Sequence, residues 1–123
     1  MSYDIIIRGN KTHSKYTDLK KLSEFISSIP YVEGNGTFFV FKKSEKYHME
    51  IDLELVSEDL AGNTIFPKPK KINVINRINF HIPYSFMDDS VIDPMIYFDI
   101  CLQIAEFVGW SAYDPQMDEF LKY

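Results

Sequence analysis

The chain has 123 residues, 46% of them hydrophobic and 25% charged, and this balance predicts one globular domain over residues 1–123. A single cysteine excludes an internal disulfide, and the lack of a basic apolar leader or a long apolar segment predicts a cytoplasmic protein without a membrane span. The formal net charge of −5 argues against nucleic acid and favours a basic protein as partner.

The first third of the chain predicts a strand followed by a helix. Residues 3–8 form a β-branched run that is closed by Gly9, which is typical of a strand. Residues 17–29 carry apolar side chains at three- and four-residue spacing, which predicts an amphipathic helix. We expect Thr17 to cap this helix and Pro30 to end it.

The middle of the chain predicts three more strands. After a turn at 33–36, residues 37–41 are apolar on both faces, as in a central strand. Residues 48–56 alternate between apolar and acidic side chains, which predicts a strand with one face exposed to solvent. A loop is expected over 58–71. Residues 72–82 predict a long strand, in which Asn76 interrupts the apolar face and indicates a bulge or a local hydrogen bond.

The last third predicts a second helix and a short strand. Asp93 and Pro94 begin the helix, which Gly109 ends, and residues 110–113 follow as a strand. A turn at Asp114 and a final helical turn over 117–121 complete the chain. This order predicts an α+β two-layer sandwich, with a mostly antiparallel four- to five-stranded sheet and both helices packed on one face.

Three carboxylates form the first candidate site. Glu50, Asp52 and Glu54 alternate along one strand, so they share one sheet face at about 7 Å spacing. They could be a solvated surface, a docking surface for a basic protein, or an acid/base or metal site. Arg77 and His81 lie on the polar face of the next strand and would neutralise part of the stripe. With Glu50 and Asp52 they define the alternative of a small enzyme or ligand-binding domain.

Neither a cofactor nor a metal site is predicted. The three histidines have no second histidine at ligand spacing, and the sequence Gly34-Asn35-Gly36 lacks the helix that a phosphate-binding loop requires. Cys101 lies within an apolar helical pattern, which predicts a buried thiol and not a nucleophile.

The segment 109–116 is the second candidate site. Its Trp110, Tyr113, Asp114 and Gln116 could form a rigid contact surface. Alternatively, Asp114 caps a turn while the two rings fill the edge of the core. The residues QIAEFVGW and YDPQ within 103–116 resemble the C-terminal end of small bacterial α+β proteins, some of which resemble the immunity proteins of polymorphic toxin systems.

Together these features predict a protein-interaction module, such as an immunity-type inhibitor, with no organised catalytic centre. The expected contacts with a basic partner are Glu50, Asp52, Glu54, Trp110, Tyr113, Asp114 and Gln116. A homodimer that pairs through its sheet face or edge is a further alternative.

Overall fold

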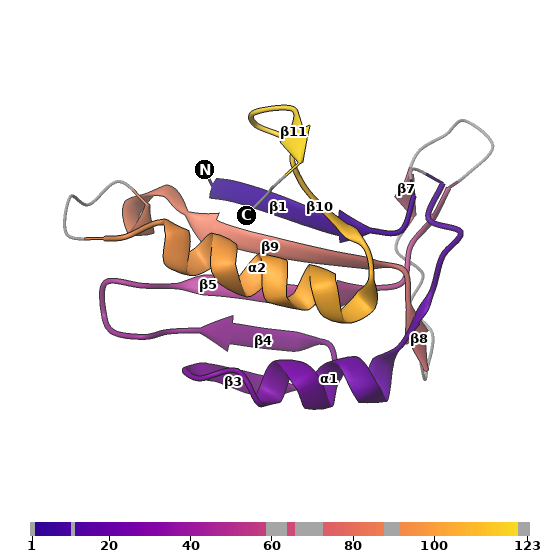
Figure 1. The fold of residues 1–123 in the computed structure, drawn as a ribbon, viewed down its shortest axis with the longest axis horizontal. Coiled ribbons are helices and arrows are strands. Elements are labelled where there is room, and N and C mark those ends of the chain that lie inside the picture. Colours follow the sequence, from indigo (N-terminus) through magenta and orange to yellow (C-terminus); the bar gives the residue numbers. More distant parts are fainter. Residues whose placement is uncertain (1, 11, 59–63, 66–72, 88–91, 121–123) are drawn as a thin grey trace.

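The computed structural model describes residues 2–10, 12–58, 64–65, 73–87 and 92–120. In this part of the chain two α-helices accompany a seven-stranded antiparallel sheet. Figure 1 shows how these elements are arranged. The predicted α+β class is confirmed, but the sheet is larger than the four to five strands expected. No described helix is long and apolar enough to cross a membrane.

The sheet has the order β11-β10-β1-β9-β5-β4-β3, and every neighbouring pair is antiparallel. Its strands are β1 (Ser2–Arg8), β3 (Val32–Asn35), β4 (Phe38–Phe41), β5 (Met49–Glu54), β9 (Arg77–Pro83), β10 (Ser111–Asp114) and β11 (Glu119–Phe120).

The strand predicted at 37–41 is not central, because β4 lies second from the edge. Most of the turn expected at 33–36 forms β3, which pairs with β4 and becomes the edge strand itself. The chain reverses at Gly36, whose positive φ of 63° suits glycine in a tight turn.

Two small antiparallel pairs lie outside the main sheet. The strand β2 (Thr17–Asp18) pairs with β8 (Val74–Ile75), and β6 (Ser57–Glu58) pairs with β7 (Thr64–Ile65). The pair of β6 and β7 overlaps the segment 58–71, which was expected to be a loop. Residues 59–63 and 66–71 of this segment lie outside the described residues.

Each helix begins within one or two residues of its predicted start. The helix α1 (Leu19–Ser27) is capped by Asp18, not Thr17, and the Asp18 carboxylate accepts a hydrogen bond from the Lys21 amide at 2.9 Å. The helix α2 (Met95–Val108) follows Pro94 and ends at Gly109, as predicted, with the glycine in the left-handed conformation. A short 3-10 helix, η1 (Tyr84–Phe86), follows β9.

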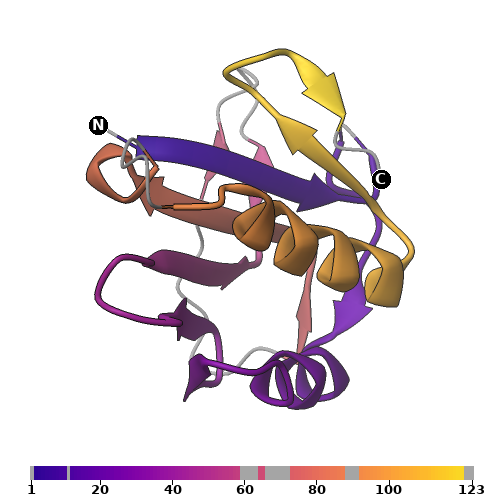
Figure 2. The same cartoon turned by 60° about the vertical axis from the view of Figure 1, so that its left-hand side comes forward.

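Both helices lie on the same side of the sheet (Figures 1 and 2), where the rings of Phe25 and Phe107 stack at 4.2 Å and join them. Alternate strand residues point toward the helices and are buried, as Ile5 and Ile7 are in β1. The opposite side, which no described helix covers, is called the open face below. Its partly or fully exposed residues include Asp4, Ile6, Arg8, Phe38, Val40, Glu50, Asp52, Glu54, Arg77, Asn79, His81, Tyr113 and Phe120.

The final segment differs from its prediction. Residues 117–120 of the helical turn predicted over 117–121 do not form one, because Glu119–Phe120 pairs with β10 as β11, and residue 121 lies outside the described residues. Asp118 precedes this strand in the left-handed conformation, with φ of 52°, and this places the hairpin bend beside it.

The strand predicted over 72–82 is divided at Asn76, which is fully buried. Its amide accepts a hydrogen bond from the Val56 nitrogen at 2.9 Å and donates to the carbonyls of Val56 and His13 at 2.9 and 3.0 Å. Of the two alternatives predicted at Asn76, a bulge or a local hydrogen bond, the structure shows hydrogen bonds, but their partners lie 20 and 63 residues away in the chain. Beside this break Val74 is exposed and Ile75 is buried.

Replacing Asn76 by alanine should lower the free energy of unfolding by about 3 kcal/mol, because three buried backbone groups lose their partner. Urea unfolding measures the change. The half-exposed Asn79→Ala is the control and should cost less than about 1 kcal/mol. Equal losses in the two variants would show that the Asn76 bonds do not stabilise the junction.

Candidate functional site

The carboxylate stripe occupies the middle of the open face. Glu50, Asp52 and Glu54 alternate along β5 with the buried apolar residues, which confirms that they share a face. Their direct neighbours across the ladder to β9 are His81, Asn79 and Arg77, respectively, as the register shows. Because β5 and β9 are central in the sheet, the stripe lies well away from either edge.

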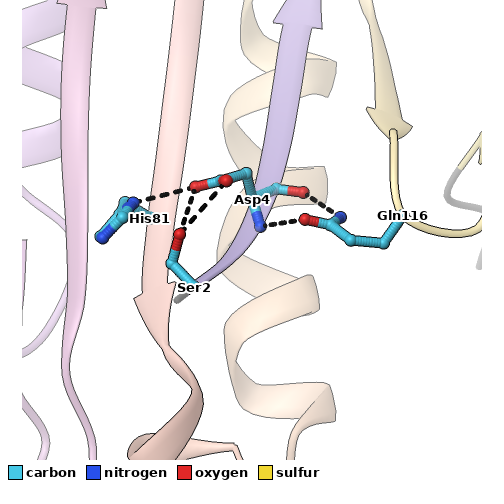
Figure 3. A network of polar contacts seen from close by, with 4 residues as sticks. All are labelled: Ser2, Asp4, His81 and Gln116. Atoms are coloured by element: carbon cyan, nitrogen blue, oxygen red, sulfur yellow. Dashed lines mark hydrogen bonds and ion pairs between the residues drawn. The ribbon is translucent and has the colours of Figure 1, made fainter.

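Only part of the expected neutralisation takes place. The Arg77 guanidinium bonds Glu54 through Nε and Oε1 at 3.0 Å. His81, however, turns toward β1, where its Nδ1 lies 2.9 Å from Oδ1 of Asp4 (Figure 3). Asp4 also accepts a hydrogen bond from the Ser2 hydroxyl.

Asp4 is a further carboxylate of the open face that was not predicted from the sequence. The sequence signal for this position is the alternation of Asp4 with Ile5, which is buried, in the first strand. What the sequence could not show is that β1 lies directly beside β9, with Asp4 opposite His81.

Glu50 and Asp52 keep their charges uncompensated. Neither side chain forms a hydrogen bond or an ion pair within the described ranges. The pKa of Asp52 is raised by partial burial and by the neighbouring Glu50, while His81 opposes the rise. Burial also raises the pKa of Glu54, against the effect of Arg77. The ionised stripe therefore lowers the stability of the folded state.

Replacing Asp52 by asparagine should raise the free energy of unfolding at pH 7 by roughly 0.5 kcal/mol, a figure that allows for screening by solvent. The raised pKa means that the charged form is disfavoured in the folded state, so the cost is present above the folded pKa. It should vanish below pH 3.8, the ordinary value of the group.

Urea unfolding at neutral and acidic pH measures this difference. The exposed Asp99→Asn on α2 is the matched control and should change stability little at either pH. A loss of stability in Asp52→Asn at pH 7 would contradict the account of the stripe.

Two residues of the second candidate site, Asp114 and Gln116, form hydrogen bonds that connect this segment to β1. Asp114 is buried, and its Oδ1 accepts hydrogen bonds from the backbone nitrogens of Gln116 and Met117 at 3.0 and 3.2 Å. Its Oδ2 accepts a hydrogen bond from the Tyr3 hydroxyl. Burial, followed by this bond and the Asp114 charge, raises the pKa of Tyr3 well above its usual range.

Where β10 ends, the side chain of Gln116 takes the place of a paired strand and bonds the backbone of β1 at Asp4. Its side-chain oxygen accepts a hydrogen bond from the Asp4 nitrogen, and its amide nitrogen donates to the Asp4 carbonyl, both at 2.8 Å (Figure 3). The same amide nitrogen donates to Asp114 at 2.7 Å. These bonds fix the position of Asp4, and through it that of His81.

The two rings of this segment have different surroundings. Trp110 is half-buried and packs against the core. Tyr113 lies on the open face, where its hydroxyl donates a hydrogen bond to Asp118 and its ring lies 5.4 Å from that of Phe120. Of the four residues predicted in this segment, the structure thus brings Tyr113 to the same face as the stripe, while Asp114 and Gln116 form internal bonds.

Replacing Asp114 by alanine should cost about 3 kcal/mol of unfolding free energy, because the Tyr3 hydroxyl and two backbone nitrogens lose their acceptor. Thermal and urea unfolding measure the loss. Asp99→Ala, which removes an exposed carboxylate from α2, should stay within about 0.5 kcal/mol of the wild type. A similar small effect of Asp114→Ala would contradict its role as an anchor.

The remaining candidate chemistry is limited in the part of the chain that the structure describes. No three His, Cys, Asp or Glu side chains there lie close enough together to hold a metal ion. Cys101 is fully buried, as predicted, and burial raises the pKa of its thiol.

Comparison with models of protein families, with curated proteins and with solved structures found no match in any of the three.

Proposed function

We propose that the chain is a protein-interaction module whose open face binds a basic protein, in the manner of an immunity-type inhibitor. The observation that carries the proposal is the pair Glu50 and Asp52, two carboxylates without a compensating partner among the described residues, at the centre of the sheet side that no described helix covers. Lysine or arginine side chains of a partner would supply the missing charge. Such complementarity speeds association and selects the partner.

Apolar side chains continue the surface on both sides of the stripe. Phe38 lies directly opposite Asp52 in the ladder and is 44% exposed. On the other side, Ile6 lies opposite Asn79, and Tyr113 lies opposite Ile6. Aromatic anchors beside charged groups are typical of the residues that carry binding energy in protein interfaces.

The arrangement supports the enzyme alternative less well. Arg77 and His81 bond Glu54 and Asp4, so they do not converge with Glu50 and Asp52 on one reacting atom. A catalytic site needs such convergence, usually within a concave pocket. An interaction surface, in contrast, can be an open sheet.

Self-association is the other alternative, through the open face or the edge strand β3. Light scattering on the purified chain distinguishes it, because the proposed function requires a partner other than a second copy.

Charge reversal on the open face tests the proposal. Immobilised wild type and Glu50→Lys/Asp52→Lys are used to capture proteins from the native lysate, and the Kd of each captured protein is then measured after purification. The double variant should bind the basic partner at least about tenfold more weakly, and rising salt should weaken the wild-type complex.

The control is Glu24→Lys/Glu106→Lys, which makes the same change of net charge on the exposed surfaces of α1 and α2. It should retain the affinity of the wild type. Equal affinity of the open-face variant and the wild type would remove the stripe from the binding surface, and an acidic or nucleic-acid partner would contradict the charge argument.

A further inference from the structure

A separate hollow lies at one end of the open face, beneath the β10–β11 hairpin. Its volume is about 350 Å³, and we call it the hairpin pocket. Its lining consists of Arg8, Gly9, Asn10, Ser111, Tyr113, Asp118 and Phe120. A volume of this size is at the lower end of the range for small-molecule sites.

Arg8 brings a positive charge without a local partner into this pocket. Of the basic side chains named above for the open face, Arg77 and His81 bond carboxylates. The Arg8 guanidinium forms neither a hydrogen bond nor an ion pair with any described residue. The pair Ile7–Ile78 places Arg8 next to Arg77 on the same face, and Arg77 is already paired with Glu54.

Asp118 supplies a negative charge to the same pocket. Its carboxylate accepts a hydrogen bond from the Tyr113 hydroxyl, but it forms no ion pair with Arg8. Both charges nevertheless act on that hydroxyl, because the bond to Asp118 raises the pKa of Tyr113 while Arg8 lowers it. A cation and an anion thus lie around one hydroxyl group without neutralising each other.

Two aromatic rings complete the lining. The rings of Tyr113 and Phe120 lie 5.4 Å apart at an angle of 57°. Phe120 is 58% exposed, so its ring is available to an apolar group of a ligand. The pocket therefore combines one positive charge, one negative charge and an apolar surface.

We propose that the hairpin pocket binds a free α-amino acid with an aromatic or large apolar side chain. The α-carboxylate of the ligand pairs with Arg8 and the α-ammonium group with Asp118, while the side chain packs against Phe120 and Tyr113. This proposal does not rest on the function proposed above, because it uses neither Glu50 nor Asp52.

A titration with phenylalanine tests the proposal. Binding is followed by amide chemical shifts in NMR spectra of the isotope-labelled full chain. We expect saturable shifts that are largest at Gly9, Asn10 and Ser111. N-acetylphenylalanine, which lacks the ammonium charge, and phenylalaninamide, which lacks the carboxylate, should each bind about tenfold more weakly or worse, since each loses one charge-assisted contact.

Two variants separate the charges. Arg8→Met and Asp118→Asn should each weaken phenylalanine binding about tenfold or more, and asparagine tolerates the left-handed backbone at position 118. Lys21→Met, an exposed charge loss on α1, is the control and should bind as the wild type does. The absence of saturable shifts, or equal binding of phenylalanine and both blocked forms, would overturn the proposal, as would wild-type affinity in Arg8→Met.

Discussion

One-sided packing of the sheet is the constraint on which the rest of the structure depends. Both helices cover the same side of the seven strands, so each strand divides its side chains between a buried face and an open one. The buried face supplies the core, with Ile51 and Phe80 fully enclosed. The open face can then carry ionised groups at its centre, because water replaces the apolar layer that would exclude them.

Two polar side chains, those of Asn76 and Gln116, form the hydrogen bonds that a neighbouring strand would otherwise form with the backbone. These bonds position the strands of the open face. Asn76 satisfies both backbone groups of Val56 where one long segment divides into β8 and β9, and the division sets the register in which β9 faces β5. At the opposite end of the sheet, Gln116 continues the ladder of β1 beyond the end of β10. The two amides therefore fix the strands from which Asp4, His81 and the stripe project.

The sequence predicted the local features well, because they depend on neighbouring residues. The spacing of residues was enough to place Glu50 and Asp52 on one face. The conformational freedom of glycine was enough to predict the end of the second helix at Gly109. The edge strand β3 was missed because Gly34 and Gly36 indicate a turn wherever they occur. The bond between Asp4 and His81 joins residues 77 positions apart, so it follows from strand order, which no local pattern specifies. For the same reason the hairpin pocket, assembled from both ends of the chain, could not be expected.

The open face is less stable than it could be, since its central carboxylates are ionised, partly buried and close together. A surface whose charges lower the stability of the folded chain in this way is well suited to a partner of opposite charge. Carbodiimide labelling of carboxyl groups tests this claim most directly, when it is read by mass spectrometry on the free chain and on its complex with the basic partner proposed above. We expect the partner to protect Glu50 and Asp52 severalfold while Glu24 and Glu106 on the helices stay reactive. Protection of the helix carboxylates, with unchanged labelling of Glu50 and Asp52, would contradict it.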